Sequence, residues 1–119
     1  MDLIIGGAYQ GKLDYAKTEY SLADSDIYTC TNDKDLDLSK RCIYHFEEYL
    51  LYCYRNGITP LLGFDEDKIV IMNDIFCGVV PIDTEIRGWR EFCGRSVSAL
   101  TKKADGVTRI FCGLPQRLK

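Results

Sequence analysis

The chain alternates between short apolar runs and longer amphipathic stretches. The short runs are rich in apolar, β-branched or aromatic residues and end at turn residues, a pattern typical of β-strands. They predict strands at residues 2–5, 27–31, 68–74 and 107–112. In the longer stretches apolar residues recur three and four positions apart, as they do on one face of a helix. These stretches predict helices at residues 11–22, 40–55 and 84–104.

The order of these elements predicts the fold class. Strands that alternate with helices favour an α/β fold, in which a mostly parallel sheet is flanked by helices and ligands bind at the carboxyl ends of the strands. The helix at residues 40–55 has the most regular pattern, since Ile43, Phe46 and Leu50 share one face and Asn56-Gly57 supplies a C-terminal stop.

Size and charge limit the organisation and the partners. A chain of 119 residues, 46% of them hydrophobic, can bury one core, so residues 1–119 are expected to form a single domain. The formal charge of −3 gives no overall attraction to nucleic acid or to an anionic membrane, so any phosphate binding must be local. The first seven residues lack the length and basic flank of a signal peptide, which favours a cytoplasmic protein.

Six cysteines raise the question of disulfides or a metal site. They are evenly spread, no two form a C-x-x-C pair, and each lies in an apolar pattern, so we expect reduced thiols in the core. They are Cys30, Cys42, Cys53, Cys77, Cys93 and Cys112. His45 is the only histidine, which disfavours mixed Cys/His zinc sites, and its pattern predicts a packed or surface position within the helix at residues 40–55.

One motif carries candidate chemistry. The residues Gly6-Gly7-Ala8-Tyr9-Gln10-Gly11-Lys12-Leu13 fit the phosphate-binding pattern G-x-x-x-x-G-K between a predicted strand and a predicted helix. Glycines let successive backbone N–H groups converge on phosphate oxygens, the helix adds its positive N-terminal end, and Lys12 neutralises the outer phosphates. The alternative is a glycine-rich turn that carries a solvated lysine.

Two further positions decide whether such a site can hold a metal. Leu13 stands where a serine or threonine hydroxyl normally ligates Mg²⁺, so other groups and water must hold the ion or phosphoryl transfer is impaired. Asp74 ends the strand predicted at residues 68–74, where a carboxylate can hold Mg²⁺ or its waters beside the phosphates. A capping or turn aspartate is the alternative for Asp74.

Four segments together resemble one known family. They are LIIGGAYQGK at residues 3–12, NDIFCGVVP at 73–81, RGWREFCGR at 87–95 and CGLPQRLK at 112–119. In this order they resemble the adenosylcobinamide kinase / adenosylcobinamide-phosphate guanylyltransferase family. The resemblance covers about the first 25 residues and everything from about residue 68 onward.

The resemblance implies a fold, a reaction and a set of ligands. It implies a P-loop NTPase of RecA-like fold, truncated relative to the family, that acts in cobalamin biosynthesis and phosphorylates the aminopropanol arm of a cobinamide with ATP or GTP. Gly6, Gly7, Gly11 and Lys12 would bind the phosphates. Asp74 would serve Mg²⁺ in place of the family's glutamate. A homo-oligomer is also implied.

The departures from the family pattern weaken the hypothesis that the protein is an active enzyme. Leu13 replaces its serine and a central block is missing, which in the family carries a guanylylated histidine in an R-x-x-x-H-x-x-x-R helix. Arg41 and His45 reproduce the first spacing, but Tyr49 replaces the last arginine. The region is either a remnant of that helix or, as we favour, the helix after the missing block, which predicts that guanylyl transfer is lost. A catalytically inactive nucleotide-binding or scaffold protein stays an alternative.

Overall fold

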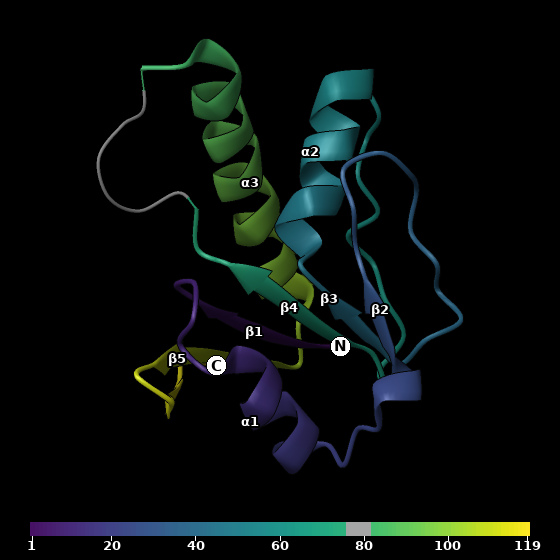
Figure 1. Ribbon diagram of the computed structural model, residues 1–119, viewed down its shortest axis with the longest axis vertical. Coiled ribbons are helices and arrows are strands. Elements are labelled where there is room, and N and C mark those ends of the chain that lie inside the picture. Colours follow the sequence, from purple (N-terminus) through teal and green to yellow (C-terminus); the bar gives the residue numbers. More distant parts are fainter. Residues whose placement is uncertain (76–81) are drawn as a thin grey trace.

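The computed structural model describes residues 1–75 and 82–119, which form a six-stranded sheet with helices on both faces (Figure 1). In chain order the elements are β1 (Asp2–Gly6), α1 (Lys12–Glu19), the 3-10 turn η1 (Asp24–Asp26), β2 (Ile27–Thr29), β3 (Cys42–Tyr44), α2 (Phe46–Asn56), β4 (Ile69–Asn73), α3 (Thr84–Lys103), β5 (Gly106–Phe111) and β6 (Leu114–Arg117). The predicted α/β class and seven-element pattern are therefore largely confirmed.

The strand order is β2-β3-β4-β1-β5-β6, and β1 lies inside the sheet between β4 and β5. All pairs are parallel except β5 with β6, which is antiparallel. The register sets Leu3 of β1 beside Val70 of β4 and Val107 of β5. The carboxyl ends of β1, β3 and β4 consequently meet at one edge of the sheet, as predicted for a mostly parallel sheet.

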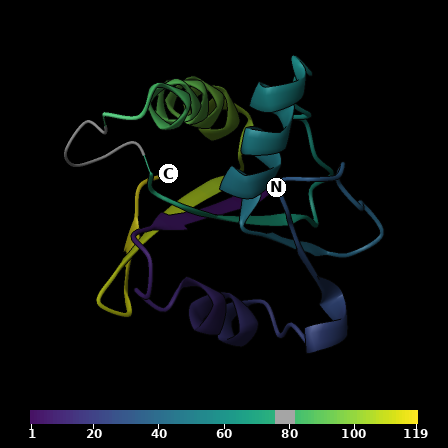
Figure 2. The ribbon, with the colours of Figure 1, turned by 45° about the horizontal axis from the view of Figure 1, so that its top comes forward.

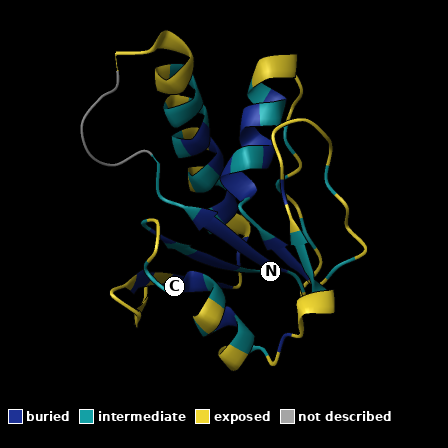
Figure 3. Cartoon of the chain, in the orientation of Figure 1, coloured by how far each residue is buried: buried dark blue, intermediate teal, exposed yellow. Residues whose placement is uncertain are grey.

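The two faces of the sheet have separate cores. Helices α2 and α3 cover one face and α1 covers the other (Figure 2). Because successive side chains of a strand point to opposite faces, Leu3 packs under α2 and α3 while Ile4 packs with Ala16 of α1. The buried residues follow the central strands and the inner sides of the helices (Figure 3).

The chain leaves β1 and β4, which are neighbours, toward opposite faces. Helix α1 follows β1 on one face, and α3 follows β4 on the other. Adjacent parallel strands whose connections diverge in this way leave a crevice beyond their carboxyl ends, where ligands of α/β proteins bind.

In the described ranges no helix combines the length and the apolar character needed to cross a bilayer.

The helix predicted at residues 40–55 is wrong in its first part. Residues Cys42–Tyr44 form β3, and α2 begins only at Phe46. Between them His45 adopts a left-handed backbone conformation, with φ 58° and ψ 47°, which ends the strand and starts the helix without a loop. The spacing of Ile43, Phe46 and Leu50 mimicked one continuous helix because no glycine or proline marks this junction.

The prediction also missed β6, the antiparallel edge strand. It follows β5 through a two-residue turn at Cys112 and Gly113, both with positive φ, the geometry that joins tightly paired antiparallel strands. All four residues of β6 are exposed, so no apolar pattern announced it. The strand carries Pro115, which suits an edge position because proline cannot donate a ladder hydrogen bond.

The core-thiol prediction holds for most cysteines. Cys30, Cys42, Cys53 and Cys93 are free and buried, as expected. Cys112 is exposed, which contradicts the prediction, because it occupies the β5–β6 turn instead of the strand itself. Cys77 lies outside the described residues.

The close approach of β1 to β5 generates a stability prediction. A Cβ added at Gly6 would lie 2.5 Å from the backbone oxygen of Ile110, and neither backbone can move without disturbing the sheet. We expect Gly6→Ala to lower the free energy of unfolding by about 1–3 kcal/mol, as overpacking does in cores. Gly7→Ala is the matched control, since its Cβ would make only ordinary contact at 3.6 Å with Gln10. Urea denaturation measures both, and an equal loss in the two variants would contradict the explanation.

Candidate functional site

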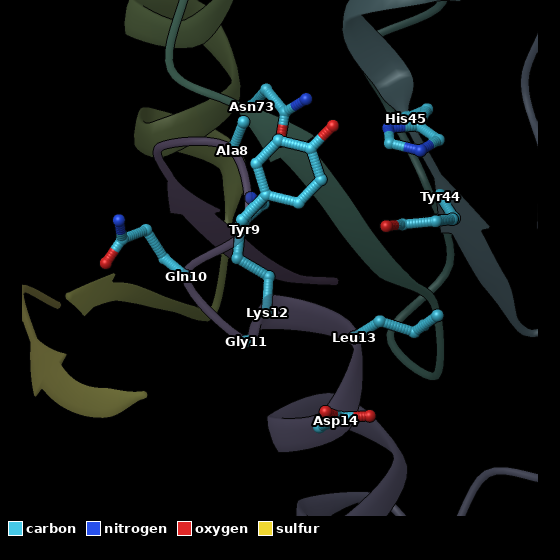
Figure 4. A pocket seen from close by; sticks show the side chains of 10 residues that line it. All are labelled: Ala8, Tyr9, Gln10, Gly11, Lys12, Leu13, Asp14, Tyr44, His45 and Asn73. Carbon is cyan, nitrogen blue, oxygen red and sulfur yellow. The ribbon is translucent and has the colours of Figure 1, made fainter. Parts of the chain in front are cut away.

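A cavity of about 510 Å³ opens beyond the carboxyl ends of β1, β3 and β4 (Figure 4). Its volume lies within the range of about 300–1,000 Å³ that is usual for small-molecule sites. It is lined by Ala8, Tyr9, Gln10, Gly11, Lys12, Leu13, Asp14, Tyr44, His45 and Asn73. Six of the eight residues of the predicted phosphate loop line this cavity; Gly6 and Gly7 do not.

The loop between β1 and α1 is curled by two left-handed residues. Tyr9 has φ 60° and Gly11 has φ 88°, and Gly11 is the residue that caps α1. Such turns aim successive backbone N–H groups into one concavity, and the first N–H groups of a helix have no partner within the helix. The loop geometry therefore suits an anion at the start of α1.

The loop is tied to the β5–β6 turn at the far end of the chain. The backbone N–H of Cys112 donates to Gln10 Oε1 at 2.5 Å, and the N–H of Gly113 donates to the carbonyl oxygen of Gln10 at 2.8 Å. The Gln10 side chain is thus committed to holding the loop against the hairpin. The shape of the loop depends on a strand that the sequence pattern did not reveal.

Lys12 is the first residue of α1 and is buried, with 5% of its surface exposed. Its Nζ donates to the carbonyl oxygen of Gly7 at 2.6 Å, across the curl of the loop. Burial lowers the pKa of Lys12, and the charge of Glu47 partly opposes this effect. Since an ammonium group carries three donors, two remain for a ligand in the cavity.

Asp74 lies beside the end of β1 and is not among the cavity-lining residues. Its N–H donates to the carbonyl oxygen of Gly6 at 2.8 Å. Within the described part of the chain no donor reaches its Oδ1, although that atom is buried. A buried carboxylate oxygen without a partner fits a cation or a cation-bound water better than it fits a capping role.

The donor set around the cavity limits how a metal could be held. Leu13 presents an apolar side chain where a hydroxyl ligand was expected, and no group of three acidic, histidine or cysteine side chains among the described residues could bind an ion alone. Mg²⁺ normally keeps several waters and needs only one or two carboxylates beside substrate phosphates. Asp74 does not line the cavity, so its service to Mg²⁺ beside a nucleotide stays a prediction.

Glu47 is a residue of the site that the sequence did not predict. It lies in the first turn of α2 with 2% of its surface exposed. Its Oε1 accepts the N–H of Asn73 at 2.7 Å, and its carbonyl oxygen accepts the indole N–H of Trp89 at 2.9 Å. Burial raises the pKa of Glu47, against the hydrogen bond from Asn73 and the charge of His45. The signal available in the sequence was an acid in the first turn of a helix, which is too common to identify a site.

His45 is not in a helix, as the sequence had predicted, but at the β3–α2 junction on the cavity wall. Its Nδ1 lies 3.2 Å from Glu47 Oε2, and its ring lies against that of Tyr44, with centroids 3.8 Å apart and planes tilted by 30°. Figure 4 shows this pair on one side of the cavity and the ring of Tyr9 on the other. The structure thus brings together six predicted site residues and a histidine–carboxylate pair that the sequence did not predict.

The arginines of α3 lie away from the cavity. Arg87, Arg90 and Arg95 are not among the described residues that line it. Glu85 of the same helix forms an ion pair with Arg55 of α2 at 2.6 Å. The local positive charge of the cavity therefore comes from Lys12.

The sequence matches no protein-family model and no curated protein. The resemblance to the adenosylcobinamide kinase family consequently stays a prediction. The function that we propose for the protein therefore rests on the geometry of the cavity.

The buried state of Lys12 predicts how stability depends on pH. Because its folded-state pKa is lowered below 10.5, the folded protein binds this proton less tightly than the unfolded chain does. The free energy of unfolding of the wild type should therefore rise relative to Lys12→Met as the pH increases toward 10.5. Lys17→Met is the control on the same helix, because the hydrogen bond to Asp24 raises the pKa of Lys17 and its contribution is lost only above 10.5. Urea denaturation across this range checks the sign, and a constant difference for Lys12→Met would contradict it.

The contact between Glu47 and Asn73 predicts a difference between two substitutions. Glu47→Ala leaves the Asn73 N–H without its acceptor and should lower the free energy of unfolding by about 1–3 kcal/mol. Glu47→Gln keeps a carbonyl oxygen in the same place and should retain most of the stability. Equal losses in the two variants, measured by urea denaturation, would show that this hydrogen bond is unimportant.

Proposed function

We propose that the protein binds the phosphates of ATP or GTP in the cavity beside Gly11 and Lys12 and transfers the terminal phosphoryl group to a hydroxyl acceptor. The observation that carries the proposal is the buried ammonium of Lys12 beneath a curled loop at the start of α1. A phosphate in this cavity would meet the ammonium, the loop N–H groups and the positive end of the helix together.

The energetics of Lys12 support an anionic ligand. Burial disfavours the charged form, and the described carboxylates include none within ion-pair distance of its Nζ. An anion placed beside the ammonium gains an attraction that is screened less at this buried group than in bulk water. Ligand binding would therefore relieve a cost that the unliganded protein carries.

Phosphoryl transfer asks for positioning and charge neutralisation more than for covalent work by the protein. Lys12 would hold the β- and γ-phosphates, and Asp74 would hold Mg²⁺ or its waters at the end of β4. The bound Mg²⁺ would supply neutralisation of the phosphate charge. The resemblance to the adenosylcobinamide kinase family supports the aminopropanol hydroxyl of a cobinamide as the acceptor, in cobalamin biosynthesis and without guanylyl transfer.

One observation favours a second function, nucleotide binding without turnover. Leu13 removes the usual metal-binding hydroxyl from the cavity, and in a scaffold protein the loop would retain affinity alone. The two functions differ in ATP or GTP consumption with and without cobinamide. Binding without consumption supports the scaffold.

Nucleotide binding itself is the primary test. We expect ATP or GTP with Mg²⁺ to raise the melting temperature, and Lys12→Ala to weaken affinity roughly 10- to 100-fold, since a charge-assisted hydrogen bond contributes about 1.5–3 kcal/mol. Isothermal titration calorimetry measures the affinities. Lys17→Ala, five positions along α1 and paired with Asp24 at 2.8 Å, is the matched control and should bind as the wild type does.

The same titrations include adenosine and guanosine, which lack phosphates and should bind far more weakly. A wild type whose melting temperature and heat signal do not respond to either nucleotide would overturn the proposal. An unchanged affinity in Lys12→Ala would assign binding to another part of the chain.

A further inference from the structure

We propose that His45 accepts the proton of the attacking hydroxyl during phosphoryl transfer and that Glu47 is the residue that positions it. This inference rests on the proposed nucleotide site and deepens it by assigning the base. It starts from the carboxylate–imidazole pair behind the cavity wall, which neither the sequence motif nor the family resemblance had assigned to this role.

The contact between the two side chains selects one state of the ring. Glu47 Oε2 lies 3.2 Å from His45 Nδ1, and a carboxylate at that distance attracts an N–H and repels a lone pair. In the proposed arrangement the neutral imidazole carries its proton on Nδ1 and keeps Nε2 as an acceptor. The Glu47 carboxylate is itself held by the N–H of Asn73, so the orienting group is fixed by the end of β4.

The backbone places this ring with little freedom. His45 is left-handed, a conformation uncommon for residues other than glycine, and it joins β3 to α2 directly. Ile43 before it and Phe46 after it are fully buried, so the junction cannot shift without opening the core. Contact with the tilted ring of Tyr44 limits one side of the ring, and the ring lines the cavity opposite Tyr9 (Figure 4).

The other amine and the carboxylate on the cavity wall suit this role less well. Lys12 is a buried cation committed to phosphate, and Asp14 is exposed on α1, below Leu13 in Figure 4. Among the described residues that line the cavity, His45 is the one acceptor side chain that has a buried carboxylate, Glu47, behind it. A base oriented by a third group is the arrangement that activates hydroxyl nucleophiles in unrelated enzymes.

The step balances without further reactants. The oxygen of the acceptor attacks the γ-phosphorus while its proton passes to His45 Nε2. The bond from the γ-phosphorus to the bridging oxygen breaks, and its electron pair leaves with ADP or GDP. The resulting imidazolium is stabilised by the carboxylate of Glu47, and its proton then returns to solvent.

Chemical rescue tests the base directly. The probe is ATP or GTP with Mg²⁺, with water as the acceptor, and the readout is phosphate release at saturating nucleotide. His45→Gly suits the left-handed backbone and leaves space for imidazole. We expect it to retain nucleotide affinity within a few-fold, to lose roughly 100-fold or more in rate, and to regain part of that rate with added imidazole.

A double variant tests the positioning residue. Glu47→Gln keeps the acceptor for Asn73 but not the charge that orients His45, so it should slow phosphate release roughly tenfold or more. The rescued rate of His45→Gly should be the same with and without Glu47→Gln, because free imidazole needs no orientation. Glu48→Gln, the neighbouring acid that pairs with Asn32, is the matched control and should release phosphate at the wild-type rate.

The outcomes separate this inference from the proposed function. Absence of nucleotide binding in the wild type overturns both. Three outcomes overturn only the role of His45 as the base, and they leave nucleotide binding standing. They are nucleotide binding without phosphate release, phosphate release that His45→Gly does not change, and a His45→Gly rate that imidazole does not rescue. A further loss of the rescued rate in the double variant overturns the positioning role of Glu47 and indicates a structural one.

Discussion

The buried carboxylate of Glu47 is the interaction on which the arrangement of the site depends. It accepts the N–H of Asn73 at the end of β4, lies against His45 at the end of β3, and acts on the charge of Lys12 at the start of α1. Three segments that are far apart in the sequence thus interact with the same carboxylate. Because a buried charge is tolerated only with such partners, the position of each partner constrains the others.

The sheet makes this convergence possible. Parallel pairing of β3 with β4 and of β4 with β1 aligns their carboxyl ends, and the divergence of α1 and α3 to opposite faces keeps the crevice beyond them open. The β5–β6 turn then closes the far side by holding Gln10. The antiparallel hairpin is therefore part of the site and not only an edge of the sheet.

Sequence patterns predicted those parts whose signal is local. The glycines and Lys12 predicted a curled loop before a helix, and that loop lines the cavity. His45 could not be placed, since β3 is three residues long and its junction with α2 keeps helical spacing. Glu47 became a site residue only through a hydrogen bond across 26 positions. Buried partners contributed by distant strands leave no pattern in a single sequence.

Leu13 shows that a departure from a motif can have its own physical reason. Besides lining the cavity, its side chain packs against the apolar cluster beneath α1 that contains Ile4 and Ala16. A serine there would give up that apolar contact, and α1 is a helix of eight residues with few other buried positions. Anchoring α1 by Leu13 holds Lys12 in place, so the residue that replaces the hydroxyl of the motif also stabilises the N-terminal end of the helix. Of the two residues predicted to serve phosphate and metal, Lys12 on α1 lines the cavity and Asp74 after β4 does not.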